Sequence, residues 1–98
     1  MALTIVKPED LKDYIGKDLG TTEWFTVDQD RINKFADATE DHQFIHVDSE
    51  KATPIFGSTI AHGFLSLSLT AGLGGDNALV VDGAKMGLNY GLCLLYTI

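Results

Sequence analysis

The sequence predicts a single domain of the α+β class, and three observations support this. A chain of 98 residues fits one domain and not two, so we assign residues 1–98 to one domain. The patterns run in the order strand, helix, apolar helix, strands. Residues 64–73 are apolar on nearly all sides, which is typical of a helix wrapped by other structure.

The N-terminal part predicts a short helix followed by a strand. Residues 8–15 begin with Pro8, which suits a first helical turn, and acidic residues follow at the positive end of the helix dipole. Gly16 suits the end of this helix. Residues 21–27 carry Thr, Trp and Phe, which favour a strand.

The next element is an amphipathic helix over residues 29–39, with Asp28 as its N-cap. Its apolar side chains recur at helical spacing on one face: Ile32, Phe35 and Ala36. We expect residues 41–47 to follow as a loop, and residues 48–52 to form one helical turn that Pro54 closes.

A longer helix is expected from about Ile60 to Leu73, where glycines end it. Residues 78–81 predict a short strand, and Asp82 with Gly83 predicts a turn. Residues 86–98 predict a longer strand, weakened by its glycines. A sheet able to wrap the apolar helix needs several strands, and these patterns supply about three.

Composition excludes some partners. The net charge of −7 argues against nucleic acid and against anionic membranes, which both attract basic surfaces. The chain has no run of about 18 apolar residues, so no membrane span is expected. Residues 1–6 are too short for a signal-peptide core. The single cysteine, Cys93, cannot form an internal disulfide, which fits a cytoplasmic location.

Asp41 and His46 are the strongest candidates for chemistry. Asp41 follows a predicted helix, where a negative charge opposes the helix dipole, so local stability does not explain it. His46 has apolar neighbours, so its loop is expected to turn inward, and a buried imidazole needs a partner. A carboxylate beside an imidazole suits proton transfer. The alternatives are a solvated acid and a loop histidine bonded to the backbone.

A metal site is a competing interpretation of the same segment. His42 and His46 are four residues apart, and on a helix they would share one face with Asp41 or Asp48 nearby. The segment is a poor helix former, and it has no glutamate between the histidines. We therefore predict that no metal is bound.

His62 and Gly63 stand where the apolar helix is expected to begin. The first amides of a helix have no internal acceptor, and a glycine lets a ligand oxygen approach them. An oxyanion or a polarised thioester carbonyl could be held there. Gly63 could instead permit close packing of the helix on a sheet. Ser68 and its polar neighbours either line a pocket or bond back to helix carbonyls.

Three motifs in order resemble one known family. Residues 41–48 read DHQFIHVD, residues 56–65 read FGSTIAHGFL, and residues 87–92 read GLNYGL. Together they resemble the MaoC-like dehydratases, and within them the nodulation-protein-N-like branch of (R)-specific enoyl-CoA hydratases. The resemblance covers about residues 5–92.

The resemblance implies a hotdog fold, in which an antiparallel sheet wraps a long helix, and a homodimer whose sheets join edge to edge. The implied reaction is reversible addition of water to a trans-2-enoyl-CoA, giving an (R)-3-hydroxyacyl-CoA. Asp41 and His46 match the catalytic dyad, and Gly63 matches the amide that binds the thioester oxygen. His62 and Ser68 complete the expected substrate-binding residues. No cofactor is implied, because coenzyme A is part of the substrate.

Two departures keep alternatives open. Relatives place a serine where this chain has Ala71, and Ser68 is the candidate substitute. After residue 92 relatives continue with further strands, so we expect a domain that is incomplete at its C-terminus. The chain would then be a truncated inactive product or a split subunit that needs a partner chain. A thioesterase on the same fold is the other alternative.

Overall fold

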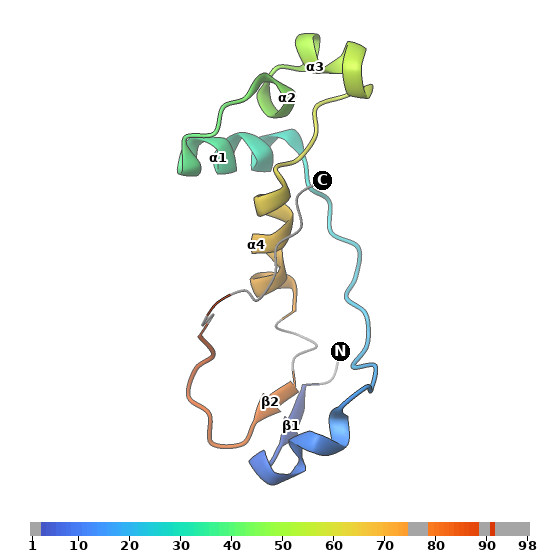
Figure 1. Cartoon of the computed structure of the whole chain (residues 1–98), viewed down its shortest axis with the longest axis vertical. Coiled ribbons are helices and arrows are strands. Elements are labelled where there is room, and N and C mark those ends of the chain that lie inside the picture. Colours follow the sequence, from blue (N-terminus) through green and yellow to red (C-terminus); the bar gives the residue numbers. More distant parts are fainter. Residues whose placement is uncertain (1–2, 75–78, 89–90, 92–98) are drawn as a thin grey trace.

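The computed structural model describes residues 3–74, 79–88 and 91. It confirms the α+β class, because helices make up most of its elements and a small sheet completes them (Figure 1). In chain order the elements are β1 (Thr4–Val6), the 3₁₀ helix η1 (Pro8–Tyr14), α1 (Gln29–Thr39), α2 (Phe44–Val47), α3 (Ser49–Phe56), α4 (Gly63–Leu73) and β2 (Leu79–Val81).

The sheet pairs β1 with β2 in parallel, with Thr4 opposite Leu79 and Val6 opposite Val81. Parallel pairing is possible because a long crossover, here all the helices, connects the two strands. β2 confirms the predicted short strand, whereas β1 was not predicted. The turn after β2 is also confirmed, because the Ala84 amide donates to the Val81 carbonyl at 3.0 Å.

Among the described residues, the sheet has two strands and does not wrap the apolar helix as the family resemblance implied. In the described part of the chain, its two strands lie beyond the C-terminal end of α4, while α1, α2 and α3 gather at the other end (Figure 1). The pair is parallel, and the expected antiparallel sheet is not present among the described residues. The longer strand predicted for residues 86–98 lies mostly outside them, and residues 86–88 form no strand.

The prediction of a strand over residues 21–27 is wrong, because this segment forms no regular element. Aromatic and β-branched residues favour a strand only when a neighbouring strand completes its hydrogen bonds and packing. No strand pairs with this segment in the described ranges, and the Trp24 side chain is fully exposed. The first predicted helix is confirmed as η1, and Gly16 follows it with a φ of 77°.

The amphipathic helix is confirmed with its predicted bounds. The Asp28 carboxylate accepts a hydrogen bond from the Arg31 amide at 2.9 Å, which satisfies one of the free amides of the first turn. Ile32 and Ala36 are buried, and this helix packs against α2. Glu40 ends α1 in the left-handed conformation, with a φ of 63°, so the chain reverses direction directly before Asp41.

The segment after α1 is more helical than predicted. The predicted loop over residues 41–47 contains the single turn α2, which the Asp48 amide closes by donating to the Phe44 carbonyl at 2.9 Å. Asp48 then caps α3, which has two turns and includes Pro54 instead of ending before it. Gly57, with a φ of 81°, ends this helix because a glycine adopts the left-handed conformation without steric cost.

The apolar helix α4 begins three residues later than predicted. Residues 60–62 form no helix, and the Ile60 amide donates to the Ile45 carbonyl at 3.0 Å. This hydrogen bond holds the approach to α4 against α2 and makes His62 the N-cap residue. Leu65 is the one buried side chain of α4 in the described structure, while Phe64 is 60% exposed. No helix of the described residues is long and apolar enough to cross a membrane.

Candidate active site

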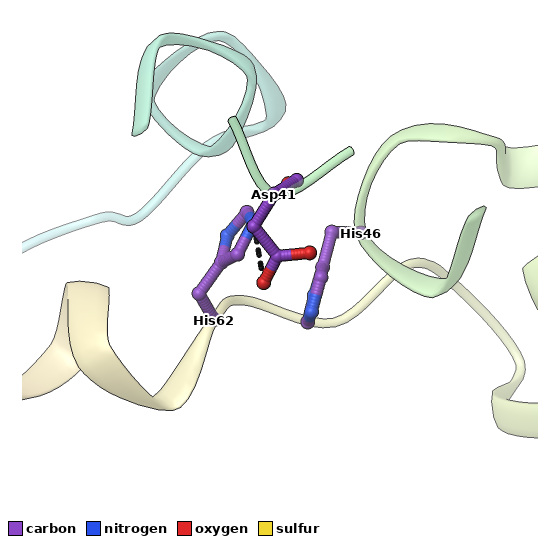
Figure 2. Close-up of side chains that lie close together, drawn as sticks. All are labelled: Asp41, His46 and His62. Atoms are coloured by element: carbon purple, nitrogen blue, oxygen red, sulfur yellow. Dashed lines mark hydrogen bonds and ion pairs between the residues drawn. The ribbon is translucent and has the colours of Figure 1, made fainter. Parts of the chain in front are cut away.

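Three side chains from separate segments meet beside the start of α4 (Figure 2). Asp41 comes from the turn after α1, His46 from α2, and His62 from the N-cap of α4. Each offers one ligand-type atom, and these atoms lie within 4.8 Å of one another. The structure therefore brings the predicted pair together and adds His62 to it.

His46 is held by its backbone and by its ring. The residue is only 8% exposed, and its Nδ1 lies 2.7 Å from the carbonyl oxygen of Ile60. Because a carbonyl can only accept, Nδ1 carries the hydrogen, and Nε2 of the neutral ring has a free lone pair. Gln29 donates to the His46 carbonyl at 2.8 Å from the first turn of α1. The bond from Gln29 therefore holds the backbone of His46. The bond to Ile60 holds the ring and leaves Nε2 as the nitrogen that can accept a proton.

His62 is the most deeply buried polar residue of the group, at 3% exposed. Its Nε2 lies 2.9 Å from the backbone carbonyl oxygen of Asp41, so this nitrogen carries the hydrogen and donates it. The ring stacks on the His46 ring with centroids 3.8 Å apart and planes inclined by 22°. The Phe35 ring also contacts the His62 ring, with ring centroids 4.9 Å apart.

Asp41 is the open member of the group. Its side chain is 49% exposed, and its Oδ2 lies 3.9 Å from His62 Nε2 (Figure 2, dashed line). In Figure 2 the carboxylate points to the two rings instead of away from them. A carboxylate that is half in solvent and directed at a ring with a free lone pair can share a water molecule with it.

The metal interpretation based on His42 is wrong. His42 lies outside the group, and its Nε2 is 2.9 Å from Oδ1 of Asp37 on α1. Asp48, the other acid considered there, accepts a bond from the Lys51 amide and caps α3. The one metal-type cluster in the described ranges is Asp41, His46 and His62. These three residues are therefore the ones that could hold a metal ion in the described part of the chain.

Gly63 is the first residue of α4, next to His62. A Cβ added there would meet nothing within 4 Å, so close packing does not explain this glycine. Its amide donates to no atom among the described residues. An amide without a partner at the first turn of a helix can donate to a ligand oxygen, and the helix dipole favours negative charge there.

Ser68 does not join the group. Its hydroxyl donates to the Phe64 carbonyl at 2.7 Å, which is the bond back to the helix that we considered for it. It borders a surface hollow of about 340 Å³ together with Phe25, Arg31, Leu69, Gly72 and Leu73. In the described structure no hydrogen bond connects it to Asp41, His46 or His62. A role in binding substrate remains a prediction for this residue.

Sequence reasoning missed two supports of the site. Gln29 was treated only as the start of a helix, although it holds the His46 carbonyl. The stacking of His62 on His46 was also missed, since the two residues are 16 positions apart in the sequence and no local pattern connects them. Only the apolar neighbours of each histidine hinted that both rings turn inward.

The sequence of the chain matches a known family. The MaoC like domain matches residues 10–87 of this chain. The chain therefore belongs to the MaoC-like family, as its three motifs indicated.

Individual relatives agree with this. The chain is 53% identical over 85 residues to nodulation protein N of Rhizobium leguminosarum bv. viciae, covering 85% of this chain and 53% of that protein. It is 48% identical over 84 residues to 3-hydroxyacyl-thioester dehydratase Z of Mycobacterium tuberculosis (strain ATCC 25618 / H37Rv), covering 85% of this chain and 55% of that protein. The chain thus spans about half the length of the curated relatives it matches.

Proposed function

We propose that this protein is a hydratase/dehydratase that adds water to trans-2-enoyl-CoA thioesters and gives (R)-3-hydroxyacyl-CoA. The observation that carries the proposal is that a ring nitrogen of His46 and a carboxylate oxygen of Asp41 lie within 4.8 Å of each other, while Nδ1 of His46 is bonded to the Ile60 carbonyl. The similarity to a protein named 3-hydroxyacyl-thioester dehydratase Z supports the same class of reaction.

The mechanism follows from the donors and acceptors of the site. Asp41 and His46 hold one water, and His46 Nε2 removes a proton from it as its oxygen bonds to C3 of the enoyl chain. The electrons of the C2–C3 double bond move to C2 and the thioester oxygen. C2 then takes up the proton held by the dyad, so the elements of one water are added. Dehydration is the same path in reverse.

The amide of Gly63 supplies the second function in this proposal. Negative charge develops on the thioester oxygen as water adds, and a donor aimed at that oxygen lowers the barrier. Gly63 suits this role because its amide has no other partner in the described part and no side chain blocks it. No cofactor is needed for these steps.

We also propose that the active assembly is a hotdog homodimer in which strands cover α4. The apolar sequence of α4 supports this, because most of its side chains are at least partly exposed in the described structure. Such a surface is expected to be covered in a stable assembly. The acyl chain of the substrate would lie against the same apolar surface.

The test is an assay with a short trans-2-enoyl-CoA, in which hydration removes the absorbance of the conjugated thioester. Asp41→Asn and His46→Ala should each lower kcat by about 10²–10⁴-fold, the usual contribution of a general acid or base. His42→Gln is the matched control, because this exposed histidine lies outside the group and should keep the wild-type rate.

The product distinguishes the competing activity. A chiral column should show the (R)-3-hydroxyacyl thioester and no free thiol. Release of free coenzyme A would mean that water attacks C1, as in a thioesterase. An inactive wild-type chain, or dyad variants with wild-type rates, would contradict the proposal.

A further inference from the structure

His62 contacts both members of the proposed dyad and is itself buried. Its ring covers one face of the His46 ring, and its Nε2 donates to the backbone of Asp41. With 3% of the residue exposed, little of the ring is left to contact a substrate. We propose that His62 is the positioning residue of the site, which holds Asp41 and His46 at their working separation; this rests on the proposed hydratase function.

The hydrogen bond from His62 fixes where Asp41 stands. The accepting carbonyl belongs to the same residue as the carboxylate, so the bond holds the turn from which that side chain projects. Oδ2 of the carboxylate lies 3.9 Å from the same Nε2, which keeps the acid directed at the rings (Figure 2). His42 ties the same turn to α1 through Asp37, and the Gln43 amide bonds Asp41 only within the turn. The donor of His62 is the bond that connects Asp41 itself to the start of α4.

The stacking contact fixes the plane of His46. The bond from Nδ1 to the Ile60 carbonyl sets the direction of the ring edge but leaves the ring free to tilt about that bond. The His62 ring, 3.8 Å away and nearly parallel, blocks tilting to one side. The two restraints together set the direction of the Nε2 lone pair, on which proton transfer to and from a bound water depends.

That residue 62 is a histidine and not another aromatic residue supports a role for the hydrogen that its Nε2 donates. Nδ1 of His62 is buried and has no hydrogen-bond partner in the described structure. A buried polar atom without a partner destabilises a fold, so a phenylalanine would stack at a lower cost. Phenylalanine cannot donate to Asp41, and that donor is what the histidine adds.

Two variants separate the two contacts. His62→Phe keeps a flat ring and loses the donor, whereas His62→Gln keeps an N–H at the position of Nε2 and loses the ring. We expect His62→Phe to lower kcat by about 100-fold, the effect of a small misplacement of reacting groups, with KM near the wild-type value. His62→Gln should recover at least part of that loss.

Ile32→Val is the control for lost stability, because Ile32 is buried on α1 but makes none of the hydrogen bonds or ring contacts of the site. It should lower the melting temperature and leave kcat unchanged. Equal kcat values for His62→Phe and wild type would overturn the proposal.

The tautomers of the two histidines can be measured on the wild-type chain, so this test does not depend on whether a variant folds. The ¹⁵N shifts of the ring nitrogens should show His62 protonated at Nε2 and His46 protonated at Nδ1. A His62 protonated at Nδ1 instead would overturn the proposal, even if His62→Phe does not fold. Failure of the hydratase proposal looks different: Asp41→Asn and His46→Ala would then keep activity, while the ring shifts would still be as expected.

Discussion

At the scale of single residues, two backbone carbonyls decide what the site can do. The Ile60 carbonyl takes the hydrogen of His46 Nδ1, and the Asp41 carbonyl takes the hydrogen of His62 Nε2. Each carbonyl accepts only, so each assigns a tautomer to its ring. As a result the two stacked rings have different tasks: His46 presents a base, and His62 presents a donor.

Gly63 gives a prediction at the same scale. Gly63→Ala should leave the fold intact, because the new Cβ meets no described atom and the backbone is helical. The free energy of unfolding should rise by about 0.4–1 kcal/mol, as is usual for Gly→Ala at a permitted position. kcat should fall by about 100-fold, since the methyl group stands where the thioester oxygen must approach the amide.

Thermal unfolding and the hydration assay measure these two effects on the same sample. A stable Gly63→Ala variant with the wild-type rate would remove Gly63 from the site. A variant that loses stability and activity together would instead show that close packing matters at this position.

At the scale of elements, the site depends on how three helices end or begin. α1 ends at a left-handed residue directly before Asp41, α2 is a single turn that carries His46, and α4 begins after His62. The caps of α1 and α3 are aspartates that accept from amides three residues later, which fixes the start of each helix. Asp41 and His62 thus lie just outside the ends of helices, and His46 lies within a helix of one turn.

His42 ties the turn after α1 back to that helix, and this gives a prediction. The hydrogen bond from its ring to Asp37 raises the pKa of His42 above its ordinary value of 6.5. Asp37→Asn should therefore lower the pKa of His42 toward 6.5, as followed by the ring protons in an NMR titration. Asp30→Asn is the control, because Asp30 pairs with Lys34 on the same helix and not with His42.

The pH dependence of this contact follows from its sign. Since the folded chain raises the pKa of His42, the pair stabilises the fold fully below pH 6.5. That stabilisation is lost as the pH rises through the higher pKa of the folded state. The effect should be small, because His42 is exposed. A titration of His42 that is the same in Asp37→Asn and in the wild-type chain would contradict the assignment.

At the scale of the whole molecule, the site and the sheet lie at opposite ends of α4 (Figure 1). The site end carries the buried histidines and several of the buried apolar residues. Large apolar side chains are exposed at both ends of the described chain: Ile5, Ile15, Trp24, Ile55, Phe64, Met86 and Leu88 are each at least 60% exposed. Surface of this kind is expected to be covered in an assembly, which is why the proposed function includes a dimer.

The elements that could be predicted are those with local signals. Asp28 and the spacing of Ile32, Phe35 and Ala36 defined α1 to the residue, because capping and amphipathic spacing act within a few residues. The turn at Asp82 and Gly83 was equally local. The proximity of Asp41 and His46 followed from their short separation in the sequence.

What could not be predicted depends on distant partners. Residues 21–27 have strand propensity but find no strand to pair with in the described ranges, and α4 has an apolar sequence without the wrapping it implies. The start of α4 moved because Ile60 bonds to Ile45, which no cap signal reveals. The place of His62 against His46 likewise depends on tertiary packing.

A double-mutant cycle between Asp41 and His46 tests the central claim most directly. If both side chains act on one shared water, the variant with Asp41→Asn and His46→Ala together should be no slower than the slower single variant, because residues that act as a unit are not additive. The measurement is kcat for hydration of a short trans-2-enoyl-CoA by the four proteins. Losses that multiply in the double variant would contradict a shared water and the mechanism built on it.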